Sequence, residues 1–151
     1  MDPVAPHLRL LQKLADHSAH IVVLGMGYVG LPLAVAFAEA GFVRVTGLDI
    51  DASKLDALQR GESYIEDVAA ERVRRVIGTR LFTSTDFEAT LATADVAIVC
   101  VPTPLNKTRD PDLRALTAAS QAIARALHPG MLVSLESTTY PGTTDELLRP
   151  M

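Results

Sequence analysis

Short apolar runs alternate along the chain with longer segments in which apolar residues recur at a helical period. The short runs predict strands and the periodic segments predict helices. The expected strands are residues 20–25, 43–50, 80–84, 95–101 and 131–137. The expected helices are residues 28–40, 52–60, 67–77, 86–94 and 112–127. Strands that alternate with helices in this way indicate βαβ units and a parallel sheet.

The first, fourth and fifth expected strands are apolar almost throughout, as strands covered by helices on both faces should be. Because βαβ crossovers are right-handed, we expect an α/β fold of the Rossmann type. This is a doubly wound parallel sheet with strand order 3-2-1-4-5. A ligand crevice should then open between strands one and four. Residues 20–151 are expected to form this domain.

Residues 1–19 are predicted to be an N-terminal helical extension, with an extra helix over residues 7–17. The apolar residues of this helix fall on one stripe, so we expect a packing helix outside the main repeat. The stripe consists of Leu8, Leu10, Leu11, Leu14 and Ala15.

The composition is that of a soluble globular protein, with 48% apolar and 21% charged residues. The net charge of −4 argues against a nucleic-acid partner, because such proteins carry a basic face. No apolar run approaches the roughly 20 residues that span a bilayer, and the N-terminus lacks the regions of a signal peptide. With one cysteine, Cys100, the chain can form no internal disulfide and no C-x-x-C zinc site. We therefore expect a cytoplasmic protein that binds neither a membrane nor a metal.

Residues 25–30 read GMGYVG and match the G-x-G-x-x-G pattern of dinucleotide-binding proteins, where an expected strand gives way to an expected helix. Gly25 would permit the tight turn, and Gly27 would let a pyrophosphate approach the backbone. Gly30 would let the helix pack closely on the strand. The helix N-terminus, with its unpaired N–H groups and partial positive charge, would face the anion. A glycine turn with a purely structural role is the alternative that the motif alone leaves open.

Asp49 supplies the second mark of such a site, an acidic residue at the end of strand two and 19 positions after Gly30. Its carboxylate could accept both ribose hydroxyls of the adenosine half and would repel the additional phosphate of NADP. NAD is therefore the expected cofactor. Asp51 is a rival acceptor, but its position at the start of a helix favours a capping role. FAD or another adenine nucleotide is an alternative on these features alone.

The segments GMGYVGLPLA, GLDID, VCVPTP and ESTTYPGTT, in this order and spacing, resemble the nucleotide-sugar 6-dehydrogenases. The resemblance runs from about residue 20 to the end of the chain. The segments PTPLNKTRDPDL and ESTTYPGTT are most similar to the branch that acts on UDP-N-acetylglucosamine and UDP-N-acetylmannosamine. A β-hydroxyacid dehydrogenase would share the sheet and the glycine motif, but it would not explain VPTP and ESTTYPGTT together.

The resemblance implies further cofactor contacts. In the family the residues between the second and third glycines contact the pyrophosphate, and here they are Tyr28 and Val29. The basic residue five positions after the ribose-binding acid is Lys54, which the resemblance places near the adenosine end. A solvated helix position is the alternative for Lys54. Ser84 and Thr85 could line the adenine side, and capping of the helix at 86–94 by Thr85 or by the following aspartate is the alternative.

The loops after strands four and five carry the remaining expected residues. Pro102 and Thr103 leave strand four beside the glycine loop, where the nicotinamide half should lie, and Thr103 could offer a hydroxyl to cofactor or substrate. A turn hydroxyl is the alternative. Glu136 ends strand five, and the matching glutamate in the family helps handle the water that hydrolyses a thioester; capping the turn is the alternative. The resemblance implies that Ser137 and Thr138 touch substrate and cofactor.

The family reaction oxidises the C6 alcohol of a nucleotide sugar to the acid with two NAD, through a thioester on a cysteine. Cys100 is not expected to be that cysteine, because it lies inside an apolar strand. The resemblance places the reactive cysteine beyond residue 151, so the chain alone is expected to bind NAD without turnover. It also implies a UDP-sugar substrate and a homodimer formed through a central helical domain. A stand-alone nucleotide-binding module is the alternative from a different class.

Overall fold

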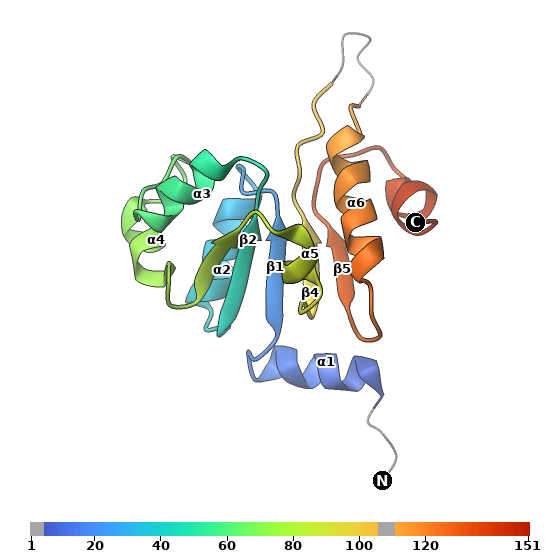
Figure 1. The fold of residues 1–151 in the computed structure, drawn as a ribbon, viewed down its shortest axis with the longest axis horizontal. Coiled ribbons are helices and arrows are strands. Elements are labelled where there is room, and N and C mark those ends of the chain that lie inside the picture. The colour runs from blue at the N-terminus through green and yellow to red at the C-terminus, as the bar shows by residue number, and fades with distance from the viewer. Residues whose placement is uncertain (1–4, 106–110) are drawn as a thin grey trace.

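The computed structural model describes residues 5–105 and 111–151. Five strands form one parallel sheet in the order β3-β2-β1-β4-β5, which confirms the expected order (Figure 1). Each strand lies within one of the apolar runs that predicted it. The strands are β1 (His20–Leu24), β2 (Arg44–Leu48), β3 (Leu81–Ser84), β4 (Val96–Val99) and β5 (Leu132–Leu135).

Helices cover both faces of the sheet and give it two apolar clusters. One face carries α2 (Gly30–Glu39), α3 (Ala52–Gln59) and α4 (Ala70–Val76), which lie on the left of Figure 1. The other face carries α5 (Phe87–Leu91), α6 (Arg114–Ala126) and a π-helical turn (Thr144–Leu148). Among the helices of residues 5–105 and 111–151, none is long and apolar enough to cross a membrane.

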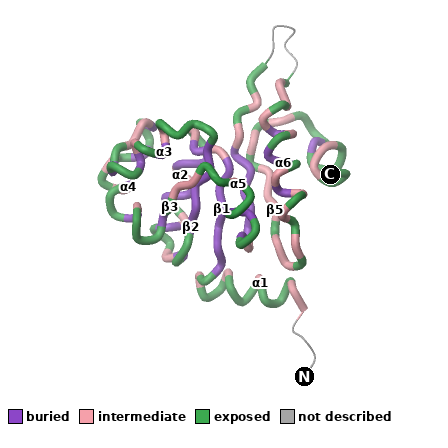
Figure 2. The backbone as a smooth tube through the Cα atoms, in the orientation of Figure 1, coloured by how far each residue is buried: buried purple, intermediate pink, exposed green. Residues whose placement is uncertain are grey.

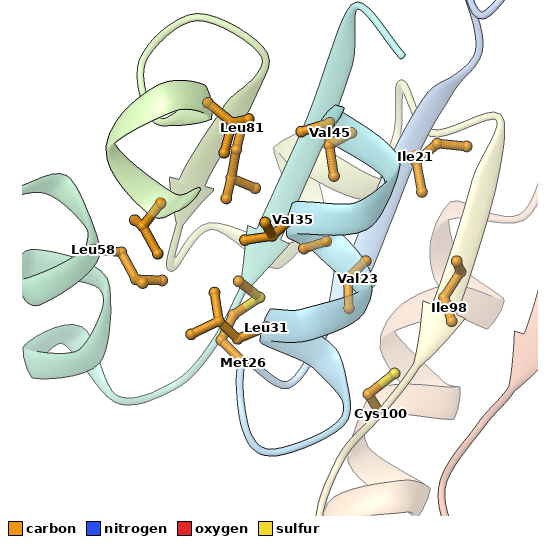
Figure 3. Close-up of a cluster of buried hydrophobic side chains, with 14 of the residues drawn as sticks. Ile21, Val23, Met26, Leu31, Val35, Val45, Leu58, Leu81, Ile98 and Cys100 are labelled. Carbon is orange, nitrogen blue, oxygen red and sulfur yellow. The ribbon is translucent and has the colours of Figure 1, made fainter. Parts of the chain in front are cut away.

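Alternate residues of β1 point to opposite faces of the sheet. Ile21 and Val23 join the cluster beneath α2, whereas Val22 and Leu24 join the cluster beneath α5 and α6. All four are at most 1% exposed, as expected for a strand covered on both faces. Figure 2 shows that the buried residues concentrate in the central strands, and Figure 3 shows the cluster beneath α2. Each buried side chain of this kind contributes about 1.5–3 kcal/mol, so the clusters hold the strand ends in fixed positions.

The expected N-terminal helix is present as α1 (Pro6–Ala15) and lies across the amino-terminal ends of the strands (Figure 1). Leu10 and Leu14 pack against the cluster beneath α2. Leu8 and Leu11 are 50% and 59% exposed, so the helix packs through only part of its apolar stripe. A helix that crosses the end of a sheet touches it along a narrow line, and only two of the leucines lie on that line.

An ion pair connects α1 to the sheet. Lys13 Nζ lies 2.6 Å from Asp95 Oδ1, and Asp95 Oδ2 accepts the backbone N–H of His20 at 2.9 Å. Asp95 precedes β4 and His20 opens β1, so the contact joins the helix to the amino ends of two adjacent strands. This places α1 at the edge of the sheet opposite to the loop that follows β1.

Two aspartates cap helices. Asp51 caps α3 as expected, because its Oδ1 accepts the N–H of Ser53 at 3.0 Å. Asp86, and not Thr85, caps α5, since Asp86 Oδ1 accepts the N–H of Ala89 at 3.0 Å. Helices α4 and α5 are shorter than expected, because residues 67–69 and 92–94 lie in bends and turns.

Candidate functional site

The candidate site lies at the carboxyl edge of the sheet between β1 and β4. These strands are neighbours, but the chain leaves β1 toward β2 and leaves β4 toward β5. The two connections therefore diverge and leave a crevice, which is where doubly wound folds bind their ligands. The glycine loop borders the crevice on one side and residues 101–105 border it on the other.

Gly25 and Gly30 are required by the packing of the chain itself. Gly25 has a φ of +95°, and a Cβ added to it would lie 2.7 Å from the carbonyl oxygen of Cys100 at the end of β4. A Cβ added to Gly30 would lie 1.8 Å from the carbonyl oxygen of Gly25. The turn after β1 is thus pressed against both the exit of β4 and the first residue of α2, and no side chain fits at either glycine.

Gly27 is different, because a Cβ added there would meet nothing within 4 Å. Helix α2 begins at Gly30 and not near Tyr28 as expected, since Tyr28 and Val29 form a turn in front of it. Tyr28 is 79% exposed and Val29 is also exposed. No side chain of the described residues caps this helix end, and no acidic residue lies in its first turn. The Leu31 N–H already donates to the carbonyl oxygen of Gly27 at 3.1 Å, and Pro32 has no N–H. The N–H groups of Val29 and Gly30 donate to no atom of the described residues, so they and the partial positive charge of the helix end face the open space at Gly27.

Asp49 follows β2 and is only 6% exposed. Its Oδ2 accepts the backbone N–H of Met26 at 2.8 Å and lies 3.3 Å from Lys54 Nζ, and its Oδ1 accepts the N–H of Asp51 at 2.9 Å. A carboxylate has about four acceptor positions, so about one is left for a ligand. The expectation that Asp49 takes both ribose hydroxyls therefore exceeds the capacity that this geometry leaves. The same carboxylate also fixes the glycine loop.

Two residues near Asp49 were not identified from the sequence as part of the site. Ile50 directly follows Asp49 and is 89% exposed. Its signal in the sequence was an apolar residue placed directly after the acid at the end of a strand. Tyr64 lies between α3 and α4, and its hydroxyl donates to the carbonyl oxygen of Met26 at 2.7 Å. Nothing in the spacing of the sequence pointed to Tyr64, because the contact depends on the path of the loop that carries it.

The structure brings the expected residues of the β4 and β5 loops together. Thr103 Oγ1 donates to the carbonyl oxygen of Thr138, and Ser137 Oγ donates to the carbonyl oxygen of Val101 at 2.8 Å. The two loops are therefore tied to each other beside the crevice. Pro102 and Thr138 are exposed there. Part of the segment PTPLNKTRDPDL, residues 106–110, lies outside the described residues.

Glu136 is exposed at the end of β5, and its Oε1 accepts the hydroxyl of Ser134 at 2.7 Å. Cys100, at the end of β4, is buried. Burial, together with the charge of Glu136, raises the pKa of the Cys100 thiol to about 11. The thiol is therefore protonated at neutral pH, which agrees with the expectation that Cys100 is not a nucleophile.

Ser84 and Thr85 lie at the same edge as Asp49. In the sheet Leu48 pairs with Ser84, so the residues that follow these two, Asp49 and Thr85, leave neighbouring strands side by side. Ser84 Oγ accepts the N–H of Asp86 at 3.0 Å, whereas Thr85 is exposed. Thr85 is therefore available at the adenosine end of the crevice.

A shallow groove of about 570 Å³ lies over β2 and β3. Its hydroxyl groups have partners in the protein: Thr46 Oγ1 lies 2.9 Å from His20 Nε2, and Thr83 Oγ1 accepts from Gln59 at 2.9 Å. The groove meets the carboxyl edge of the sheet only at Ser84, so we do not assign it to the cofactor. The groove is lined by Val43, Arg44, Thr46, Phe82, Thr83, Ser84 and Thr90.

In the described part of the chain, no group of three or more His, Cys, Asp or Glu side chains is arranged to hold a metal ion.

Comparison with known proteins decides which group of dinucleotide-binding proteins this is. The sequence profile of the UDP-glucose/GDP-mannose dehydrogenase family, NAD binding domain, matches residues 19–151. The chain belongs to this family. Membership confirms the predicted family and the predicted cofactor, NAD.

Individual members of the family are similar to the chain over most of its length. It is 38% identical over 130 residues to the UDP-N-acetyl-D-mannosamine dehydrogenase of Pyrococcus horikoshii, and the aligned segment covers 85% of the chain and 31% of the relative. It is 40% identical over 127 residues to the UDP-N-acetyl-D-glucosamine 6-dehydrogenase of Pseudomonas aeruginosa, covering 83% and 29%. A ternary complex of GDP-mannose dehydrogenase from Pseudomonas aeruginosa has a TM-score of 0.80 and 31% identity, over 87% of this chain and 31% of that one. The chain thus spans about three tenths of the length of the curated relatives that it matches.

Proposed function

We propose that the chain binds NAD along the carboxyl edge of β1 and β4, with the pyrophosphate at the N-terminus of α2. The observation that carries this proposal is the open space at Gly27, where an added Cβ would meet no atom of the described residues within 4 Å. Packing explains Gly25 and Gly30, but it does not explain Gly27, so close approach of a ligand accounts for that glycine. The N–H groups of Val29 and Gly30 supply donors, and the uncapped end of α2 supplies the positive potential that a diphosphate needs.

The adenosine half fits at the end of β2. Asp49 has capacity for about one ribose hydroxyl, and Lys54, with donor capacity to spare on Nζ, is the proposed partner of the second. The exposed Ile50 offers an apolar surface to the adenine ring. Hydrogen bonds from Ser53 lower the pKa of Asp51, so Asp51 is ionised at neutral pH. The 2′-phosphate of NADP would then meet two carboxylates and one ammonium group, which favours NAD.

We further propose that the chain serves a nucleotide-sugar 6-dehydrogenase acting on a UDP-N-acetylhexosamine, the substrate class in the names of the relatives above. NAD bound at this edge would accept the hydride from C6 of the sugar. Thr103 and Glu136 are the proposed residues at the reacting end: Thr103 holds the β4 loop to the β5 turn, and the exposed Glu136 carboxylate can take a proton from water.

The thiolate of the proposed reaction has to come from elsewhere. Cys100 is the single cysteine of the chain, and it is buried and protonated. We infer that the nucleophile lies outside residues 1–151, that the complete enzyme is a homodimer, and that it works in the cytoplasm, where an unpaired cysteine stays reduced. The chain alone should therefore bind NAD and release no uronic acid from any UDP-sugar.

Calorimetric titration of the chain with NAD and NADP tests the cofactor assignment. We expect NAD to bind and NADP to bind at least about tenfold more weakly, because like charges would meet at Asp49 and Asp51. Asp49→Asn removes the charge at nearly constant shape and should narrow this difference. Equal affinities for the two cofactors in the wild type would contradict the ribose assignment, and the absence of NAD binding would contradict the proposed function. Release of the uronic acid from a UDP-sugar would contradict the inference about the nucleophile.

A further inference from the structure

The backbone of Met26 is held by side chains from two other parts of the chain. On one side, the N–H of Met26 donates to Asp49 Oδ2 at 2.8 Å. On the other, the carbonyl oxygen of Met26 accepts the hydroxyl of Tyr64 at 2.7 Å. Both polar backbone groups of the residue between the first two glycines are thus bound outside the glycine loop.

The side chain of Met26 removes the remaining freedom of this residue. Met26 is completely buried and lies beside Leu31 in the cluster beneath α2 (Figure 3). It occupies the space over Gly47 of β2, where an added Cβ would lie 2.5 Å from Met26 Sδ. The residue is anchored at its N–H, its carbonyl oxygen and its side chain, so its backbone cannot rotate without breaking one of the three contacts.

The orientation of the Met26 carbonyl decides where the next N–H points. The carbonyl of Met26 and the N–H of Gly27 belong to one peptide unit, and no peptide bond in the described residues is cis. In a trans peptide the two groups point in opposite directions. Because the carbonyl points to Tyr64, the Gly27 N–H points away from Tyr64, and it donates to no atom of residues 5–105 and 111–151.

We propose that Tyr64 is a positioning residue for NAD, whose hydroxyl holds the Met26–Gly27 peptide so that the Gly27 N–H is aimed at the pyrophosphate. The inference rests on the proposed placement of the pyrophosphate at the N-terminus of α2. Without the Tyr64 hydroxyl the Met26 carbonyl has no partner among residues 5–105 and 111–151, and the peptide can turn its oxygen toward the site. A carbonyl oxygen facing the diphosphate would repel it.

The surroundings of Tyr64 suit this role. Burial, together with the charges of Asp49 and Asp51, raises the pKa of its hydroxyl above the usual value, so the group stays protonated and remains a donor. Tyr64 is half-buried and its ring packs against the cluster beneath α2, which fixes the position of the hydroxyl.

The test compares Tyr64→Phe, which removes only the hydroxyl, with Ser63→Ala. The latter removes a neighbouring hydroxyl that bonds the carbonyl oxygen of Ile65 within its own loop at 3.1 Å. Dissociation constants are measured for NAD, for ADP-ribose and for adenosine, with thermal unfolding as a check that each variant is folded. We expect Tyr64→Phe to raise the dissociation constants of NAD and ADP-ribose by about 3- to 10-fold, the usual effect of one hydrogen bond, and to leave that of adenosine unchanged. Ser63→Ala should leave all three unchanged.

A nuclear magnetic resonance measurement gives a readout that a merely structural role would not move. In Tyr64→Phe the Gly27 amide resonance should shift, because the Met26–Gly27 peptide loses its fixed orientation, whereas amides of β4 and β5 stay as in the wild type. Wild-type affinity for NAD in Tyr64→Phe overturns the inference, and so does an equal loss for adenosine, since that indicates general loosening. A wild-type chain that binds no NAD contradicts the proposed function instead, so the two failures are distinguishable.

Discussion

The Oδ2 atom of Asp49 lies 2.8 Å from the backbone nitrogen of Met26, so the acid at the end of β2, the proposed ribose ligand, also holds the glycine loop. One carboxylate thus connects the two halves of the proposed adenosine-diphosphate site. Removing this carboxylate should lower both the stability of the loop and the affinity for the cofactor.

Asp49→Ala should lower the free energy of unfolding by about 1–3 kcal/mol, because it leaves the buried N–H of Met26 without an acceptor. It should also lower the affinity for NAD. Urea denaturation gives the first quantity and calorimetry the second. Asp56→Ala on the exposed surface of α3 is the matched control and should change neither. An Asp49→Ala protein with wild-type stability and NAD affinity would contradict the dual role.

The second and third glycines of the motif should respond differently to alanine. Gly27→Ala should fold with wild-type stability and bind NAD roughly tenfold more weakly, a loss of about 1.4 kcal/mol, because the new methyl group stands where the ligand approaches. Gly30→Ala should be less stable by about 1–3 kcal/mol, because its methyl group meets the carbonyl oxygen of Gly25. Thermal unfolding and calorimetry on the pair separate the two effects. A destabilised Gly27→Ala would show that packing, and not a ligand, requires that glycine.

Cys100 should be unreactive in the folded chain. Its pKa of about 11 against an ordinary value of 9.0 corresponds to about 100-fold less thiolate near neutral pH, and burial slows modification further. Reaction with iodoacetamide at pH 8, followed by mass spectrometry, should be slow in the native chain and fast in urea. The raised pKa also means that the folded state holds the thiol proton more tightly than the unfolded state. This stabilisation is complete below about pH 9 and is lost as the pH rises through about 11. Rapid native labelling would disprove the burial.

The Lys13–Asp95 pair should support stability without affecting the cofactor. Burial acts to raise the pKa of Asp95, but the hydrogen bonds from Lys13 and from the His20 N–H outweigh it and lower the pKa. A lowered carboxyl pKa stabilises the fold above its unfolded value of 3.8, and the effect is lost as the pH falls through the folded value. Lys13→Met should cost about 0.5–1 kcal/mol at pH 7, allowing for the exposure of the pair, and the difference from wild type should shrink in acid. NAD affinity should stay unchanged, because the pair lies at the opposite edge of the sheet; a loss of NAD affinity would contradict this separation.

The sheet could be predicted from the sequence because its strands are short, apolar and separated by helical segments, which leaves few possible topologies. The glycine loop could be predicted because strand, glycines and helix occur in the required order, and Asp49 follows at the required distance. Contacts that depend on how a loop runs through space could not be predicted, and Tyr64 is the main example. Periodicity also could not show that α1 buries Leu10 and Leu14 while leaving Leu8 and Leu11 in solvent. The roles of Thr103, Glu136, Ser137 and Thr138 toward a ligand stay predictions.

The contact between Met26 and Gly47 sets a rule for how such a chain can change over generations. The sulfur of Met26 occupies the volume that a side chain at position 47 would need, so the two positions share one fixed space. A substitution that enlarges residue 47 is tolerable only after residue 26 has become smaller, and the reverse order passes through a damaged intermediate. The two positions should therefore vary as a linked pair among descendants that keep this loop, with the sum of their side-chain volumes nearly constant.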